Sequence, residues 1–585
     1  MLRRFGSCLL LVAVLTGPRQ VAQAAEAWDA FSTDAGVVVR IRKPEETIEK
    51  VATLVDQVVP GAGAQVRLQA DGIGIMVSNP TLAGANKKAD WWLAVYPRPA
   101  GEEPEVVYVI PATDLKAMQE AVGSNAKFQE FESFGVYTSD ADAAELTAGR
   151  LKGTSKSIST LVEKPSLAVF DKGDVSVFIN VRRLSTVYKA QIEEARDNVS
   201  QGIESIPSEI PNAPGMNPKA IAEEFGELFN MLLQGLSETQ SCTIALAISK
   251  EGLVFEDLVR VDSGSATDKF LQKAAPGALA GLGMLPVGGL GYVGMQGNLS
   301  EMAQFGLKIT SNMLGDTDAA KEMQKALAEM KDLKFGAVVS TFNLGNFDEG
   351  AIRSITVSEV SEPAKVRSLS ERLAKAMASI EQGGMKQSYE LKKDAEKLGN
   401  HSVDVMTMTM AMGDLGDPTA TAMVERLMKG MYGPDGMVSR TVYLKDKVVQ
   451  AAGGGKEPLT RALAALDKKA DASGSSKPFQ AARSRLAEKA NFVGLMDLPG
   501  SISKLLEAVA ESGLLPPMIP LNPEMFRSLN LQPSYLGMSV ATEAQGLRVH
   551  TSVPVEQMQG MAKIVQMFIM LQQGGFPAEQ DDQNQ

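Results

Sequence analysis

The chain has 585 residues, of which 44% are hydrophobic and 22% are charged, and its formal net charge is −12. This composition excludes a disordered or fibrous chain, and the length predicts at least two domains or one duplicated architecture. The excess of acidic residues argues against nucleic acids and anionic membrane surfaces as partners, because both are polyanionic.

The amino terminus has the pattern of a secretory signal peptide over residues 1–24. Arg3 and Arg4 precede a short apolar run over residues 8–16, and Ala22-Gln23-Ala24 has the small-x-small form of a cleavage site. We therefore expect an exported protein, periplasmic or extracellular, with no transmembrane segment after cleavage. Cleavage removes Cys8 and leaves Cys242 without a disulfide partner. The alternation around Cys242 favours a small buried strand residue over a nucleophilic thiol.

Four segments repeat one pattern, in which an alternating strand and a polar turn precede an amphipathic helix. The strands begin near residues 37, 175, 291 and 492. Two further strands follow each helix, and the pattern places a glycine at the turn between them, because short hairpin turns require a positive φ. These glycines are Gly72, Gly252, Gly350 and Gly546.

The spacing of these segments predicts an internal duplication. Residues 128–151 and 440–466 share the order strand, turn, strand and helix, and each stretch lies between the two repeated segments of one half. We expect an α+β fold with two similar halves, residues 26–280 and 285–577, followed by a disordered tail over residues 578–585. Each half is predicted to hold antiparallel sheets, with hairpins flanked by amphipathic helices on one face.

Most predicted helices carry an apolar stripe of the kind that packs on a core, whereas the last predicted helix is different. One such stripe at helical spacing predicts core packing and is formed by Ile221, Phe225, Leu228, Phe229, Leu232 and Leu233. The last helix, over residues 561–571, is apolar on nearly every side, with Met561, Ile564, Val565, Phe568 and Leu571 on one face and Met567, Ile569 and Met570 on the others. We expect this helix to be sandwiched between layers or to contact a partner.

Motifs of catalysis are weak in this sequence. Gly289–Gly294 matches a dinucleotide-binding string, but the string reads as the start of a strand. Ser501 and Lys504 match S-x-x-K without its companion motifs, so Ser501 is predicted to be a helix N-cap. His401 and His550 are the only histidines, and neither has metal-ligand spacing. We therefore predict no catalytic residue, no metal site and no cofactor.

A group of apolar residues remains as a candidate contact surface. Trp91 and Trp92 are adjacent on a predicted strand, so one ring is expected in the core and the other, Trp92, on the surface, where it could stack on a sugar. The proposed surface consists of Trp92, Leu515, Met518, Ile519, Met567 and Met570.

The favoured function is that of an exported, non-catalytic binding or scaffold protein. The chain holds 29 methionines, and methionine-rich surfaces adapt to varied apolar ligands or protein partners. The alternative is a cell-envelope hydrolase that uses carboxylates or Ser501. In its general character the chain resembles large exported bacterial proteins of unassigned function, a resemblance that carries no diagnostic motif and no site residue.

Overall fold

The computed structural model describes residues 27–99, 101–123, 126–206, 218–313, 317–330, 333–378, 380–382, 385–412, 418–468, 471–511 and 522–572. The chain divides into two compact units. The first holds Met1–Ser205, Glu223–Ala275 and Ser539–Val555, and the second holds Ile206–Ala222, Pro276–Met538 and Glu556–Gln585. Both are built from helices and antiparallel strands, which confirms the α+β class.

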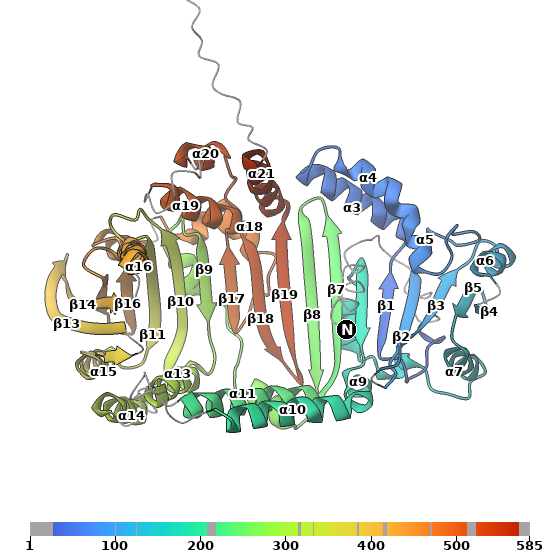
Figure 1. Cartoon of the computed structure of the whole chain (residues 1–585), viewed down its shortest axis with the longest axis horizontal. Helices are drawn as coiled ribbons and strands as arrows, with labels where there is room; N and C mark the ends of the chain where they lie inside the picture. The colour runs from blue at the N-terminus through green and yellow to red at the C-terminus, as the bar shows by residue number, and fades with distance from the viewer. Residues whose placement is uncertain are drawn as a thin grey trace, which may run out of the picture. The chain divides into compact units, whose positions relative to one another are not determined.

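The sheet of the first unit grows outward from β1 (Val37–Ile41), which pairs with β2 (Trp91–Tyr96) and β6 (Val175–Ile179). Beyond β2 come β3 (Glu105–Pro111), β5 (Phe134–Thr138) and β4 (Lys127–Phe131). Beyond β6 come β7 (Thr239–Ser249), β8 (Gly252–Val261) and β19 (Gly546–Pro554) (Figure 1). All these pairings are antiparallel.

Helices cover both faces of this sheet at β1 and β2. One face packs against α3 (Pro44–Val58), α5 (Ile73–Met76) and α6 (Leu115–Val122), and α4 (Ala62–Gln69) lies beside α3. The other face packs against residues 27–35, α7 (Ala141–Leu151), the 3-10 turn η3 (Ile158–Leu161) and α8 (Lys164–Phe170). The expectation of helices on one face is therefore wrong for this region.

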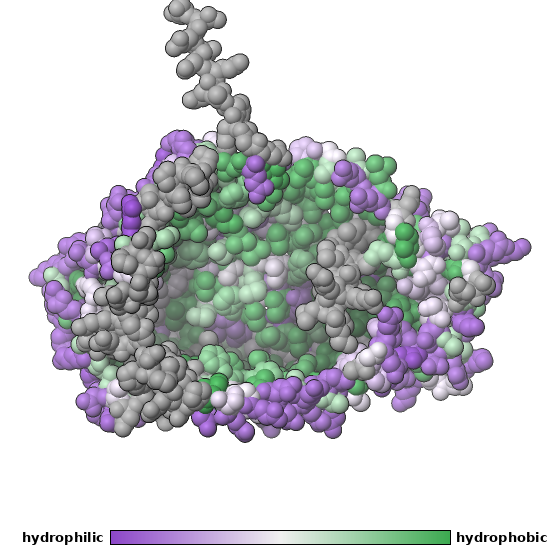
Figure 2. Space-filling view, viewed as in Figure 1, coloured by the Kyte–Doolittle hydropathy of each residue, from purple (hydrophilic) through white to green (hydrophobic). Residues whose placement is uncertain are grey.

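The remaining helices of the first unit carry little of its core. They are α9 (Val181–Val187), α10 (Lys189–Glu204), α11 (Pro218–Ser237) and α12 (Ala266–Gln272). No residue of α10 is buried, and its side chains form a hydrophilic band (Figure 2). Gly226 of α11 faces Ile203 of α10, where a β-carbon would lie 2.4 Å from the isoleucine.

The sheet of the second unit grows outward from β9 (Gly291–Met295), which pairs with β10 (Phe335–Leu344) and β17 (Phe492–Met496). Beyond β10 come β11 (Ile352–Val360), β16 (Lys447–Ala452), β15 (Met437–Tyr443), β14 (His401–Met412), β13 (Met385–Leu398) and β12 (Ile380–Gln382). β18 (Leu536–Glu543), α21 (Val555–Gln572) and the first turn of α11 cross the division between the units.

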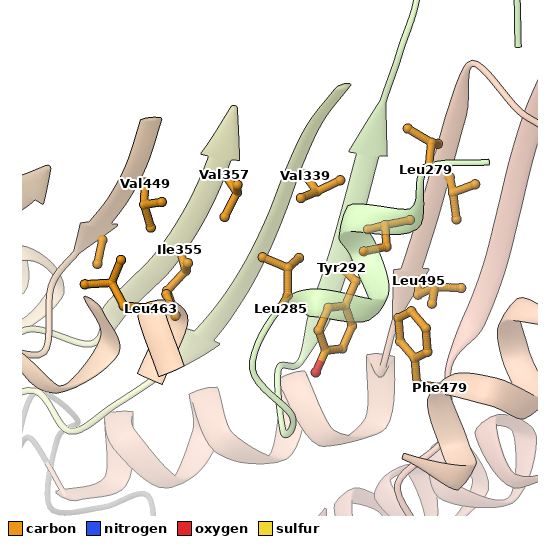
Figure 3. Close-up of a cluster of buried hydrophobic side chains, with 14 of the residues drawn as sticks. Leu279, Leu285, Tyr292, Val339, Ile355, Val357, Val449, Leu463, Phe479 and Leu495 are labelled. Atoms are coloured by element: carbon orange, nitrogen blue, oxygen red, sulfur yellow. The ribbon is translucent and has the colours of Figure 1, made fainter. Parts of the chain in front are cut away.

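The core of the second unit lies between its strands and two helices that follow β16. Side chains of β9, β10, β11, β16 and β17 meet those of α17 (Glu457–Lys468), α18 (Lys477–Arg483) and the 3-10 turn η4 (Ala280–Met284) (Figure 3). The other helices are α13 (Leu299–Met313), α14 (Asp318–Met330), α15 (Pro363–Ala376), α16 (Pro418–Tyr432), α19 (Leu498–Glu511) and α20 (Pro523–Ser528).

The repeated strand–helix pattern is confirmed at β1, β6, β9 and β17. The predicted turn glycines are confirmed at Gly252 and Gly350, with φ of 127° and 91°. The turn predicted at Gly72 is wrong, because residues 70–76 continue as short helices and the hairpin forms later, between β2 and β3. At the β18–β19 turn the positive φ belongs to Gln545, and Gly546 instead lets the backbone approach Val259, whose oxygen would lie 2.5 Å from an added β-carbon.

The predicted signal peptide over residues 1–24 and the predicted tail over residues 578–585 lie outside the described residues. Within the described part of the chain, no helix is long and apolar enough to cross a lipid bilayer.

Candidate functional site

Three acidic side chains of the first unit come close enough to suggest a cation site. Carboxylate oxygens of Glu105, Asp140 and Asp142 lie within 4.8 Å of one another. The guanidinium of Arg98 already pairs with all three, at 3.1 Å from Asp140 and 3.0 Å from Asp142. Asp140 also caps α7 by accepting hydrogen bonds from the backbone N–H groups of Asp142 and Ala143. These acids therefore serve a helix start and an ion-pair cluster.

A buried arginine gathers a second group of charges in the first unit. Arg40 is 2% exposed, donates to the Phe170 carbonyl at 2.7 Å and to Asp171 at 3.2 Å, and lies 5.0 Å from the centre of the Phe170 ring. Burial lowers the pKa of Arg40 and raises the pKa of Asp90, whose carboxylate lies 4.0 Å from it. These contacts join β1 to the segment before β6, which is a structural role.

Ser501 does not have the surroundings of an activated nucleophile. It lies in the first turn of α19, and its Oγ donates to the Asp497 carbonyl at 2.6 Å. The prediction that Ser501 is the N-cap is wrong, because Asp497 accepts from the Gly500 N–H and caps the helix instead. Among the described residues no histidine or carboxylate hydrogen-bonds to the Ser501 hydroxyl, so the geometry gives the hydrolase alternative no nucleophile–base pair.

The feature that stands out is one face of β7, β8 and β19, which we call the apolar face. Strand register places its members on the same side, since Ile244 and Val549 both lie opposite Asp257, and Cys242 and Leu547 both lie opposite Val259. Its half-buried side chains are Cys242, Ile244, Leu253, Phe255, Asp257, Val259, Leu547, Val549, Thr551 and Val553. Figure 2 shows hydrophobic residues gathered around β8 and β19.

The apolar face continues a covered surface, but no described helix packs over it. Leu246 and Ile248, near the end of β7, are 1% and 2% exposed, and α3 contacts this strand. Towards β19 the side chains are only half-buried, although β7 and β8 have strand partners on both sides. On the opposite face Val169 of α8 packs on Ala245 and Leu258, and all three are buried. Among the described residues, the lack of a covering layer therefore concerns the apolar face and not the opposite face.

Charges on these strands are concentrated on the opposite face, where they are paired. Glu256 lies 2.7 Å from the Lys172 ammonium, contacts the Arg548 guanidinium, and lies 3.8 Å from His550 Nε2. Arg548 also lies 2.5 Å from Glu543. Burial lowers the pKa of His550, which favours its neutral imidazole. Each of these charged side chains therefore already has a partner within the chain.

Asp257 is the exception to this separation, because it places a carboxylate in the middle of the apolar face. Its same-face neighbours are Ile244 on β7, Val549 on β19, and Phe255 and Val259 on β8 itself. Among the described residues no hydrogen-bond donor or cation pairs with it. Burial and then the nearby Glu256 raise the pKa of Asp257 to about 6.

Cys242 lies diagonally from Asp257 on the same face. Burial, and secondarily the charge of Asp257, raise the pKa of the Cys242 thiol to about 11. A thiol with so high a pKa is protonated at neutral pH and is a poor nucleophile. Cys242 was predicted to be a small buried strand residue. It lies on a strand but is half-buried on the apolar face rather than part of the core.

Of the predicted contact surface, only Trp92, Met567 and Met570 belong to the described residues. Trp92 is 2% exposed and packs against Trp28, Phe170 and Phe178. Trp91 is 1% exposed on the other face, so the expectation that one ring is on the surface is wrong, because both faces of β2 are covered. Leu515, Met518 and Ile519 lie outside the described residues.

The last helix buries a side that combines residues of the two predicted groups, Ile564 from one and Met567 from the other. Met567 is 2% exposed, whereas Met570 is 43% exposed. The buried stripe of α21 is Gln557, Gly560, Ile564 and Met567, while Val565, Phe568, Ile569 and Met570 face outward. A polar residue and a glycine set this face, since Gln557 donates to the Ser534 carbonyl and Gly560 packs against Pro499. Met570 remains a surface candidate, and Met567 belongs to the core.

The apolar stripe of α11 is also more exposed than its spacing predicted. Phe225, Leu228 and Leu232 are 58%, 37% and 65% exposed, so the prediction of core packing is wrong for them. The helix contacts α10, which has no buried residue, and so no layer covers this stripe among the described residues. The helix leads directly into β7, next to the apolar face (Figure 1).

Comparison with known proteins identifies no relative, since no family model, no curated protein and no solved structure matches the chain.

Proposed function

We propose that this chain is an exported, non-catalytic binding protein that holds a long hydrocarbon chain on the apolar face. The observation that carries the proposal is the row of half-buried aliphatic and aromatic side chains across three adjacent strands whose other face is covered or ion-paired. Each methylene group taken out of water against such a surface is worth about 0.8 kcal/mol, so a chain of ten or more carbons gains substantial affinity.

The polarity of the face favours a hydrocarbon over a protein. Protein interfaces carry about one hydrogen bond per 100–200 Å² of buried area. Here β7 and β8 have strand partners on both sides, so their backbone groups are already bonded. The polar side chains of the face are only Asp257, Thr551 and Cys242. A partner with few hydrogen-bonding groups of its own fits this surface best.

The test is the binding of a neutral apolar probe, Nile red, followed by its fluorescence and by competition with 1-dodecanol. Val549→Arg places a cation on the apolar face and is expected to weaken binding at least tenfold. Leu68→Arg is the matched control, because Leu68 is 81% exposed and belongs to α4 rather than to a strand of the face. Equal binding by both variants, or no displacement by dodecanol, contradicts the proposal.

Occupation of the face by a second copy of the chain is a separate outcome of this test. A stable dimer that Val549→Arg dissociates, and that binds no probe, assigns the face to self-association instead. Analytical ultracentrifugation of both variants distinguishes the two results.

We further propose that the chain is a duplication of residues 26–280 in residues 285–577. The strand order β4–β5–β3–β2–β1–β6 in the first unit has the counterpart β15–β16–β11–β10–β9–β17 in the second. The helices α7 and α8 then correspond to α17 and α18, and β12–β14 form an insertion. Isolated bridges Ser32–Ser157 and Pro286–Ala472 occupy matching places. Superposition of experimentally determined units tests this proposal, and equivalent strands that present opposite faces contradict it.

A further inference from the structure

We propose that the ligand of the apolar face is a long-chain cation, whose hydrocarbon part lies along β7, β8 and β19 and whose ammonium-type group pairs with Asp257. This inference rests on the proposed function and names the chemical class of its ligand.

The first argument is the position of the carboxylate. Asp257 occupies the centre of β8, with an apolar residue beside it on each neighbouring strand. A carboxylate in such a setting loses hydration and regains little, because no described residue donates to it. The other acidic residue at this level, Glu256, points to the opposite face and has Lys172 and Arg548 as partners. The chain therefore pairs Glu256 with cationic side chains and leaves the carboxylate of Asp257 without one. Asp257 can pair with the cationic group of a ligand.

The second argument is charge complementarity. The chain carries a formal net charge of −12, which attracts cations and repels anions. A fatty acid or an anionic lipid would bring a second negative charge next to Asp257, in surroundings where like charges repel strongly. A neutral alcohol would hydrogen-bond to the carboxylate without compensating its charge. An ammonium group does both, and charge-assisted hydrogen bonds are the stronger kind.

The experiment compares three probes of equal chain length with the full chain carrying Cys8→Ser, so that Cys242 is its only cysteine. Dodecylammonium, 1-dodecanol and dodecanoate, each below its critical micelle concentration, are titrated by competition with Nile red. Alkylation of Cys242 by N-ethylmaleimide reports whether the probe lies on this face, because Cys242 belongs to it. We expect dodecylammonium to bind at least tenfold more tightly than the other two and to slow the alkylation of Cys242.

Asp257→Asn removes the charge while keeping the size of the side chain. We expect this variant to bind dodecylammonium and dodecanol with equal affinity and to keep its dodecanol affinity unchanged. Asp262→Asn is the control, because Asp262 follows the same strand but lies among Arg182 and Gln240. It is expected to keep the full preference for the cation.

The outcomes separate this inference from the proposed function. If the three probes bind equally and all protect Cys242, the apolar face binds hydrocarbon chains but Asp257 does not select a cation, and the inference is wrong. If the preference for dodecylammonium survives in Asp257→Asn, the cation is attracted by the general acidity of the chain, and the inference is again wrong. If no probe binds or protects Cys242, the proposed function itself fails.

Discussion

Strands β2 and β8 belong to the same sheet and differ in what covers them. In β2 the adjacent Trp91 and Trp92 point to opposite faces, and both are buried by helices or by the segment 27–35. In β8 the adjacent Asp257 and Leu258 also point to opposite faces, but only Leu258 is buried. The comparison teaches that alternation identifies a strand, whereas elements distant in the sequence determine whether each of its faces becomes core.

The largest effect is expected from shortening a side chain on the doubly covered strand. Trp92→Ala removes a ring packed against Trp28 and Phe170, and should lower the free energy of unfolding by about 3–5 kcal/mol. Phe255→Ala on the apolar face should cost about 1–2 kcal/mol, because the ring is only half-buried. Urea unfolding of both variants measures the difference. Equal losses would show that β8 is covered as fully as β2.

A charge placed on each side of α21 tests the same principle on a helix. Met567→Lys buries an ammonium group on the covered side and should cost about 2–4 kcal/mol. Met570→Lys, on the open side, should change stability by less than about 0.5 kcal/mol. Thermal unfolding followed by circular dichroism checks both. A large loss from Met570→Lys would mean that another layer covers the outer side.

The pH dependence of stability sharpens the comparison at Asp257. Because the pKa of Asp257 is raised to about 6 in the folded chain, the folded state binds a proton more tightly than the unfolded state does. Ionisation of Asp257 therefore destabilises the folded chain. This loss of stability develops as pH rises from about 4 to about 6. Asp257→Asn should stabilise the protein by about 1–2 kcal/mol at pH 8, after allowance for solvent screening, and by almost nothing at pH 4. A stabilisation that does not depend on pH would contradict the assignment of the raised pKa.

A small effect is also expected at Cys242. Cys242→Ser exchanges a thiol for a hydroxyl on a half-buried strand position and should cost about 1 kcal/mol or less, with the fold retained. Binding of dodecanol should survive the change. Loss of binding with an intact fold would give the thiol a direct role that its high pKa argues against.

Sequence reasoning located the strands more reliably than the surfaces. The strands near residues 37, 175, 291 and 492 were found because alternation and turn residues are local signals. The faces of α11 and α21 were misjudged because Gly226, Gln557 and Gly560 set the packing through partners that single-sequence periodicity does not reveal. The candidate site was missed, yet it left a signal: Asp257 stands in phase with Leu253, Phe255 and Val259 on a strand otherwise apolar on that side.

The central position of β8 has a consequence for how a ligand would be detected. Its backbone amides are bonded to β7 on one side and to β19 on the other, so they are protected from hydrogen exchange before any ligand arrives. A molecule that covers only the side chains of this face adds no hydrogen bond to that backbone. The hydrogen-exchange rates of the β8 amides should therefore not change when the ligand binds. The NMR methyl resonances of Ile244, Val259 and Val549 should shift instead.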